Sequence, residues 1–224
     1  MEKLKLICNP LSAFSSRVLI ALAYKKIPFD IEYYDHERDS ETLKEINPLG
    51  TVPVVILEDG TIIYESMAIL ELLDTLPVYH STIKIFPSDP IKRVQVKMNV
   101  ERLDALTTRL GPAVRKGAQE GLTGINKGVQ VFRDILGENQ FLTGEQFGVT
   151  DICIFPFVDR LCTFPEIKER LYEDPGIKEW YETILSFEAV QDRLGRIRPE
   201  DFHSAVRNDR AGKNPVIWPP RDLI

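Results

Sequence analysis

The stretch Ile46-Asn47-Pro48-Leu49-Gly50-Thr51-Val52-Pro53-Val54-Val55, followed by Tyr64-Glu65-Ser66, decides the interpretation of this chain. It predicts a loop, a strand that begins at a Val-Pro step, a turn, a second strand, and a helix that begins at an acidic and a hydroxyl residue. A proline cannot donate a ladder hydrogen bond, so Pro53 is expected at a strand start. A cis Val52-Pro53 bond would leave the backbone N–H and C=O of Val52 available to a ligand. The Glu-Ser pair at a helix N-terminus suits the charged groups of a small zwitterion.

The composition predicts a globular protein that binds neither nucleic acid nor membrane. Of the 224 residues, 43% are hydrophobic and 28% are charged, and the net charge is −6, which argues against a nucleic-acid partner. The chain has no apolar run of about 18 residues, and its first residues lack the apolar segment of a signal peptide, so a cytoplasmic location is expected. The cysteines and histidines are too few and too scattered for a disulfide framework or a metal site, so we expect none; the cysteines are Cys8, Cys153 and Cys162.

Hydrophobic periodicity predicts an α/β fold in the first part of the chain, because strand and helix patterns alternate. The predicted strands are residues 3–8, 29–34, 53–57 and 61–64, and the predicted helices are residues 14–22, 40–46 and 65–76. The order is βαβ and then αββα. A mixed four-stranded sheet with three helices is the compact arrangement of these elements.

The composition changes at Leu76-Pro77, and beyond Pro90 the pattern is helical. One apolar stripe runs over residues 96–110 and is expected to end at Gly111-Pro112, and a second runs over residues 125–136 and ends at Gly137. Further helices are predicted over residues 149–162, with Pro156 inside, and over 177–187 and 190–197. We therefore predict domains at residues 1–77 and 91–206, a linker at 78–90 and a tail at 207–224.

Three motifs in this order point to a known family. They are Ser12-Ala13-Phe14-Ser15-Ser16-Arg17-Val18, the loop Asn47–Val54, and Glu65-Ser66 followed by Ala68-Ile69 and Leu72-Leu73. Together they resemble the soluble glutathione transferases over nearly the whole chain, from Lys3 to about Leu194. The resemblance implies a thioredoxin-like domain followed by an all-helical domain, a cis Val52-Pro53 bond, and a homodimer. It also implies detoxification chemistry, with glutathione as co-substrate and an electrophilic small molecule as second substrate.

Ser12 is the predicted catalytic residue, because it lies between the first strand and the first helix. A hydroxyl at that helix N-terminus can donate a hydrogen bond to the thiolate of bound glutathione. A hydrogen bond to a charged acceptor stabilises by about 1.5–3 kcal/mol and a helix N-terminus by about 0.3–1 kcal/mol. Together, these two contributions are large enough to lower the pKa of a thiol by about two units, and no metal is needed. The alternatives are that Ser12 only caps the helix, or that Ser15 or Ser16 meets the thiolate.

The resemblance implies a further set of substrate contacts. Val52, before Pro53, would bind the peptide part of glutathione through its backbone. Glu65 would bind the γ-glutamyl ammonium group and Ser66 the carboxylate, whereas Thr51 stands where many relatives carry a longer side chain toward the glycine end. The second-substrate pocket is expected from the family layout to include Leu11, Phe14, Asp104 and Thr108.

Gly148-Val149-Thr150-Asp151-Ile152 resembles the family's box at the start of the central helix. Asp151 is expected to bond back to the N-cap N–H as the acidic member of a capping box. The hydroxyl partner is missing because Gly148 takes its place, so we predict a weaker but intact cap. On this interpretation, Gly148→Ser raises the melting temperature.

Two other functions remain open from the sequence. The chain is compatible with a binding or regulatory module of the same fold that does not catalyse, although the retained motif set argues against this. A thioltransferase or dehydroascorbate reductase would need Cys8 as a reactive thiolate, although a core role fits this cysteine better. Trp218 in the tail has three interpretations: a lid over the second-substrate pocket, an anchor on the helical domain, or part of a disordered tail.

Overall fold

A computed structural model of the chain describes residues 3–9, 11–34, 36–76, 82–115, 119–162 and 164–196. The described residues form two compact units. Among the described residues, the first unit contains those up to Lys84 together with Glu188–Arg196, and the second contains Ile85–Phe187. The predicted tail and Trp218 lie outside the described residues.

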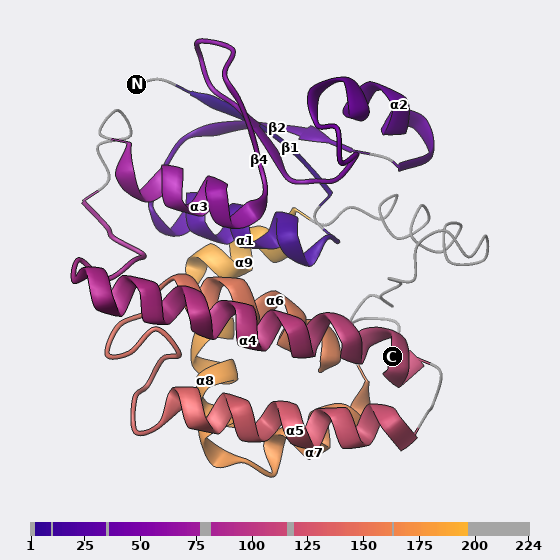
Figure 1. The fold of residues 1–224 in the computed structure, drawn as a ribbon, viewed down its shortest axis with the longest axis vertical. Helices are drawn as coiled ribbons and strands as arrows, with labels where there is room; N and C mark the ends of the chain where they lie inside the picture. Colours follow the sequence, from indigo (N-terminus) through magenta and orange to yellow (C-terminus); the bar gives the residue numbers. More distant parts are fainter. Residues whose placement is uncertain are drawn as a thin grey trace. The chain divides into compact units, whose positions relative to one another are not determined.

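The first unit contains the predicted sheet (Figure 1). Its strands are β1 (Leu4–Cys8), β2 (Phe29–Tyr33), β3 (Val54–Ile56) and β4 (Ile62–Tyr64), in the spatial order β2-β1-β3-β4. β1 and β2 are parallel, whereas β3 is antiparallel to both β1 and β4. The helices are α1 (Ala13–Tyr24), α2 (His36–Ile46) and α3 (Ser66–Thr75). The predicted mixed four-stranded sheet and its element order are confirmed.

Alternation along β1 directs its side chains to the two faces of the sheet. Ile7 belongs to one core cluster with Tyr34, Leu43 and Val54, so α2 covers that face. Leu4, Leu6 and Cys8 take the alternate positions and are also buried. α1 and α3 pack against each other. Helices therefore lie on both faces of the sheet, and the loops that border the site begin and end at its strands.

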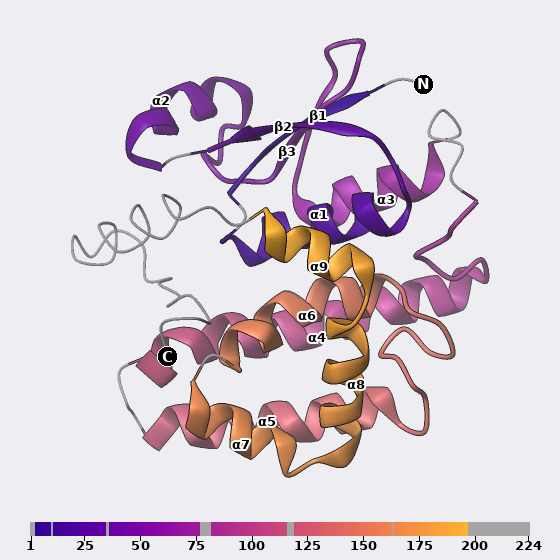
Figure 2. The ribbon, with the colours of Figure 1, turned by 180° about the vertical axis from the view of Figure 1, so that it is seen from behind.

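The last described helix, α9 (Glu188–Gly195), belongs to the first unit and packs against α1. Figures 1 and 2 show the two helices side by side from opposite directions. Ala189, Val190 and Arg193 are the buried residues of α9. The helical domain was predicted to extend to residue 206, so the sheet unit includes a helix that sequence reasoning placed elsewhere. The linker and tail boundaries stay predictions.

The second unit is helical, as predicted, and consists of α4 (Pro90–Arg115), α5 (Gln119–Leu136), α6 (Val149–Leu161), α7 (Pro165–Tyr172) and α8 (Pro175–Leu185). The prediction that the first of these ends at Gly111-Pro112 is wrong, because α4 continues to Arg115. Proline removes one internal hydrogen bond, and this loss falls in the last turns of a 26-residue helix. α7 was not predicted, although Pro165 at its first turn and the buried Ile167 and Leu171 carry the signal.

α6 begins at a closed network of hydrogen bonds. Asp151 is fully buried and accepts from the backbone N–H groups of Leu142, Thr143 and Gly148 at 2.7, 3.2 and 3.0 Å, and from the indole N–H of Trp180 at 2.8 Å. Burial raises the pKa of the Asp151 carboxyl, while these donors favour its charged form. The predicted bond from Asp151 to the N-cap N–H is confirmed.

The missing hydroxyl of the α6 cap is supplied from an earlier loop. Thr143 Oγ1 accepts from the N–H of Thr150 at 3.0 Å, and the Ile85 carbonyl accepts from the N–H of Val149 at 2.8 Å. A Cβ on Gly148 would lie 2.6 Å from the Ile85 carbonyl oxygen and 2.6 Å from Thr143 Cγ2. The expectation that Gly148→Ser stabilises the protein therefore lacks support, because the space for a side chain is already filled.

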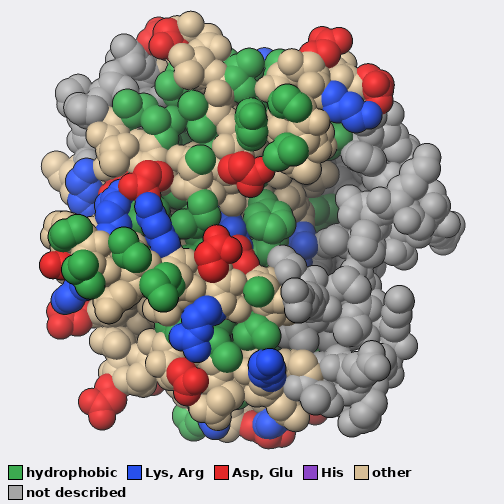
Figure 3. All heavy atoms as spheres, viewed as in Figure 1, with side chains coloured by type: hydrophobic (Ala, Val, Ile, Leu, Met, Phe, Trp, Pro, Cys, Tyr) green, Lys and Arg blue, Asp and Glu red, His purple; other side chains and the backbone are tan. Residues whose placement is uncertain are grey.

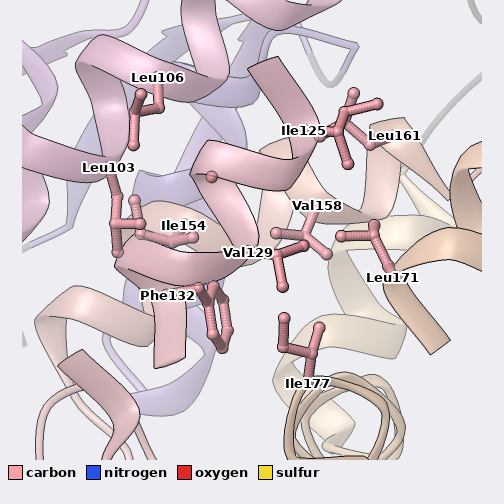
Figure 4. Close-up of a pocket in the computed structure, with 11 residues that line it drawn as sticks. Leu103, Leu106, Ile125, Val129, Phe132, Ile154, Val158, Leu161, Leu171 and Ile177 are labelled. Atoms are coloured by element: carbon pink, nitrogen blue, oxygen red, sulfur yellow. The ribbon is translucent and has the colours of Figure 1, made fainter. Parts of the chain in front are cut away.

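The interior of the helical unit contains a small cavity of about 30 Å³ (Figure 4). Its walls are apolar side chains from several helices, including Leu103, Val129, Phe132 and Val158. None of the described residues that line it has a polar side chain. Within the described residues, no helix combines the length and apolar character that crossing a membrane requires.

Candidate functional site

The register of the sheet brings the predicted site segments to one end of the first unit. Ile7 pairs with Val54, and Val54 pairs with Tyr64, so these residues form one row across three strands. The chain leaves β1 toward Ser12 just beyond this row, enters β3 from Val52, and leaves β4 toward Glu65. Segments far apart in sequence therefore border the same edge.

Ser12 is the N-cap of α1. Its side-chain oxygen accepts from the N–H of Ser15 at 3.3 Å, and its carbonyl accepts the first helical bond from the N–H of Ser16 at 2.8 Å. The side chain is only half-buried. Because the hydroxyl oxygen accepts from the protein, its proton can be donated to a ligand. The capping role that was the alternative is therefore present, and it is compatible with ligand binding.

Ser15 and Ser16 lie behind Ser12 in the interior of the unit. Both are fully buried. Ser15 Oγ accepts from the N–H of Asn9 at 3.4 Å, and Ser16 Oγ donates to the carbonyl of Ser12 at 2.9 Å. Of the three serines in this turn, Ser12 is thus the one whose side chain is accessible.

The loop before β3 is held by Asn47. Its side-chain amide donates to the Thr51 carbonyl at 2.7 Å and to Thr51 Oγ1 at 3.2 Å, and its oxygen accepts from the N–H of Leu49 at 3.1 Å. Gly50 has a φ of +62°, which glycine adopts readily. The Val52-Pro53 bond is cis, as the resemblance implies. Among the described residues, neither the N–H nor the C=O of Val52 has a hydrogen-bond partner.

Glu65 and Ser66 open α3 with different environments. Glu65 is exposed, has a φ of +70° and makes no side-chain capping bond. A non-glycine residue in this region is uncommon, and such residues concentrate at binding and active sites. Ser66 is buried, and its hydroxyl accepts from Arg17 Nη1 at 3.3 Å. The N-terminus of α3 is therefore open toward the edge, with a charged donor behind its first hydroxyl.

Arg17 and Asn47 are site residues whose roles sequence reasoning missed. The Arg17 side chain is 1% exposed, and its guanidinium lies 4.7 Å from the centroid of the Phe14 ring. The sequence leaves two alternatives for Arg17, an ion pair with an acidic group or a solvated helix residue, and its burial excludes the solvated one. A signal was present in both cases, because Arg17 and Asn47 stand inside two of the three motifs that carried the family resemblance.

The residues of the predicted second-substrate pocket belong to both units. Leu11 is buried and Phe14 is 39% exposed, both in the first unit. Asp104 and Thr108 belong to α4 in the second unit, and the Thr108 side chain lies outside the described residues. This pocket stays a prediction.

The cysteines do not offer a reactive thiolate. Cys8 is fully buried in β1, and burial raises the pKa of Cys162 to about 12, so this thiol stays protonated near neutral pH. Cys153 is buried in α6. Within the described residues, no cluster of three or more His, Cys, Asp or Glu side chains is arranged to hold a metal. The polar groups that the structure places at this edge include the Ser12 and Ser66 hydroxyls, the Val52 backbone, the Arg17 guanidinium and the Glu65 carboxylate.

Comparison with known proteins identifies both units. The family model described as Glutathione S-transferase, N-terminal domain matches residues 11–76, and Glutathione S-transferase, C-terminal domain matches residues 99–188. The pyrimidodiazepine synthase of Drosophila melanogaster is 30% identical over 208 residues, which cover 82% of this chain and 83% of that protein. Glutathione S-transferase omega-1 of Mus musculus is 28% identical over 172 residues, covering 75% and 70%.

A solved structure shows the same fold. The glutathione S-transferase of Methylobacillus flagellatus KT, solved with GSH bound, superposes with a TM-score of 0.72 at 23% identity, covering 85% of this chain and 98% of that one. The matched domains span the loop at Val52, the start of α3 and the central helix α6. The chain therefore belongs to the glutathione S-transferase family.

Proposed function

We propose that this protein activates the thiol of glutathione with the Ser12 hydroxyl and transfers the thiolate to an electrophilic small molecule. As a glutathione S-transferase, the protein uses glutathione as its co-substrate. The observation that carries the proposal is the exposure contrast in the first turn of α1: Ser12 is half-buried, whereas Ser15 and Ser16 are fully buried. Ser12 is therefore the hydroxyl that a bound thiol can reach.

The remaining contacts follow from the groups at the sheet edge. The N–H and C=O of Val52 would pair with the peptide backbone of glutathione, as in strand addition. Ser66 would donate to the γ-glutamyl carboxylate while Arg17 donates to Ser66, and the exposed Glu65 would bind the ammonium group. Thr51 would lie beside the glycine end. Its carbonyl and its hydroxyl oxygen both accept from Asn47, so its hydroxyl proton can be donated to a ligand.

The reaction needs an ionised sulfur. A free thiol has a pKa near 8.5, so about a few per cent is thiolate at pH 7. The Ser12 hydrogen bond and the N-terminus of α1 favour the anion, and the thiol proton passes to solvent. The sulfur lone pair then forms a C–S bond with the electrophile, which releases its leaving group or takes up a proton. Peroxide reduction and isomerisation use the same thiolate.

We also propose a homodimer, supported by apolar side chains that are exposed in each unit. Ile91, Val94 and Met98 recur on one side of α4 and are 55–67% exposed, and hydrophobic side chains gather over the beginning of this helix in Figure 3. Ile62 and Tyr64 of β4 are exposed as well. Exposed apolar groups of this kind are typical of interfaces. The oligomeric state in solution, measured by light scattering, tests this point.

We also propose a cytoplasmic location. The three cysteines are free thiols, which is the state that a reducing compartment maintains. Glutathione would also stay reduced there. Fractionation of cells that express the full chain checks the location.

The proposed function is tested by ultraviolet difference titration with glutathione near neutral pH, in wild type and in Ser12→Ala. We expect a saturable thiolate band in wild type and its loss in the variant, with glutathione still bound. Ser15→Ala is the matched control and should keep the band. Wild-type protein that binds glutathione without ionising it would instead support a non-catalytic binding module.

A further inference from the structure

Arg193 of α9 reaches the first turn of α1 although it lies 177 positions away from its partner in the sequence. Its Nε donates to Ser16 Oγ at 2.9 Å, and its residue is 3% exposed. Both helices belong to the first unit. A buried guanidinium is costly to desolvate unless it is hydrogen-bonded, so its placement against one particular hydroxyl calls for an explanation.

The Ser16 hydroxyl links this guanidinium to Ser12. It accepts from Arg193 Nε and donates its own proton to the carbonyl of Ser12 at 2.9 Å. The same carbonyl accepts from the N–H of Ser16 at 2.8 Å. A charged donor polarises the hydroxyl that it binds, and consecutive hydrogen bonds strengthen one another. Two donors from one residue therefore hold the peptide plane that follows Ser12.

We propose that Arg193 is a positioning residue for the Ser12 site, acting through Ser16 to fix the backbone from which the Ser12 hydroxyl projects. This inference rests on the proposed role of Ser12 toward the glutathione thiolate. Fixing the peptide plane fixes the direction of the hydroxyl proton, and the buried positive charge adds to the anion-favouring field at the helix N-terminus. The C-terminal helix of the unit thus contributes to thiol activation without touching the substrate.

Arg17 gives an internal parallel for this arrangement. Its guanidinium is also buried and also donates to a serine hydroxyl, that of Ser66. Arg17 therefore donates to Ser66, the serine proposed to bind the carboxylate. Arg193 donates to a serine in the turn that holds Ser12, the residue proposed to contact the sulfur. The thiolate and the γ-glutamyl carboxylate of the co-substrate would thus each meet a serine-containing turn supported by a buried guanidinium.

The test compares wild type, Arg193→Met, Ser16→Ala and the double variant by titrating the thiolate absorbance of bound glutathione against pH. Each single variant should raise the apparent pKa of the bound thiol by about half a unit, which is about a threefold smaller thiolate fraction below both pKa values. The double variant should show the same shift in pKa as each single variant, because both changes break the same chain of hydrogen bonds from Arg193 through Ser16 to the Ser12 carbonyl. Melting curves establish that each variant is folded.

Arg196→Met is the matched control, because Arg196 directly follows the same helix but pairs with Asp192, and its guanidinium lies 4.8 Å from the ring centroid of Phe29. It should leave the thiol pKa unchanged. An unshifted pKa in folded Arg193→Met or Ser16→Ala, or an equal shift in Arg196→Met, overturns the proposal. Should Arg193→Met fail to fold, Ser16→Ala decides alone. Wild-type protein without a thiolate band overturns the role of Ser12 as well, so the two failures are distinguishable.

Discussion

The N-termini of α1 and α6 both carry N–H groups without helical partners, but the hydrogen-bond acceptors for these groups differ between the two helices. At α6, Asp151, Thr143 and the Ile85 carbonyl take up these donors, and Asp151 is 0% exposed. At α1, a single side-chain bond of 3.3 Å to the half-buried Ser12 serves the same purpose. A saturated helix end stabilises the fold, whereas an open one is available to a ligand anion.

The largest effect, a loss of stability, is expected when the hydrogen bonds at the N-terminus of α6 are broken. Asp151→Asn replaces one acceptor oxygen by a donor that faces N–H groups, and a buried donor left unsatisfied costs about 1–3 kcal/mol. We expect the free energy of unfolding to fall by at least about 3 kcal/mol, measured by urea denaturation. Asp134→Asn is the control, because Asp134 is an exposed carboxylate on α5; an equal loss there would contradict the prediction.

At the N-terminus of α1, a substitution should reduce activity strongly and stability only slightly. Ser12→Ala removes the proposed hydrogen bond to the thiolate, worth about 1.5–3 kcal/mol, so kcat/KM for conjugation should fall about 10- to 100-fold. The lost cap bond is long and partly exposed, so stability should fall by less than about 1 kcal/mol. Steady-state kinetics and melting curves on one preparation check both parts. A variant that loses stability but keeps activity would remove the contrast between the two helix ends.

Adding a hydroxyl to the α6 end should not improve it. In Gly148→Ser the new Cβ would meet the Ile85 carbonyl oxygen at 2.6 Å, and this carbonyl is already bound to the N–H of Val149. Overpacking of this kind costs about 1–3 kcal/mol, so the melting temperature should fall. Gly195→Ser serves as the control, because no atom lies within 4 Å of a Cβ there. A rise for Gly148→Ser would restore the simple capping interpretation.

The smallest effect is expected at Thr143, which lends its hydroxyl to α6. Thr143→Val removes the acceptor for the N–H of Thr150 and keeps the shape, so a loss of about 1–2 kcal/mol is expected. Thr143→Ser keeps the oxygen and should lose less. Thermal unfolding of the two variants side by side makes the comparison, and equal losses would assign the effect to the methyl group instead.

Local patterns were sufficient for the sheet and for most helices, because β1 alternates, α5 has a clear apolar period and α6 is apolar over most of its length. The ends of elements were harder, since Pro112 lies inside α4 and no local rule decides whether one lost hydrogen bond ends a helix. The sequence also indicated the cis bond before Pro53, but only through family resemblance.

Long-range contacts could not be predicted from the sequence. Thr143 caps a helix from a different segment, Arg17 binds Ser66 across 49 positions, and Arg193 binds Ser16 across 177. Neither Thr143 nor Arg193 stands in one of the three motifs, and the motif that contains Arg17 does not indicate its partner. Which polar group they meet is decided by the packing of whole helices, so local spacing carries no information about it.

The assembly of the first unit from both ends of the chain has a consequence for biosynthesis. The ribosome makes residues up to Lys84 early, but α9 begins only at Glu188. At about 5–20 residues per second, the intervening segment takes roughly 5–20 s to translate. During that interval the surface of α1 that later receives α9 lacks its cover, and the nascent helical unit has time to fold first. The Ser12 turn would then reach its final geometry only after most of the polypeptide has been synthesised.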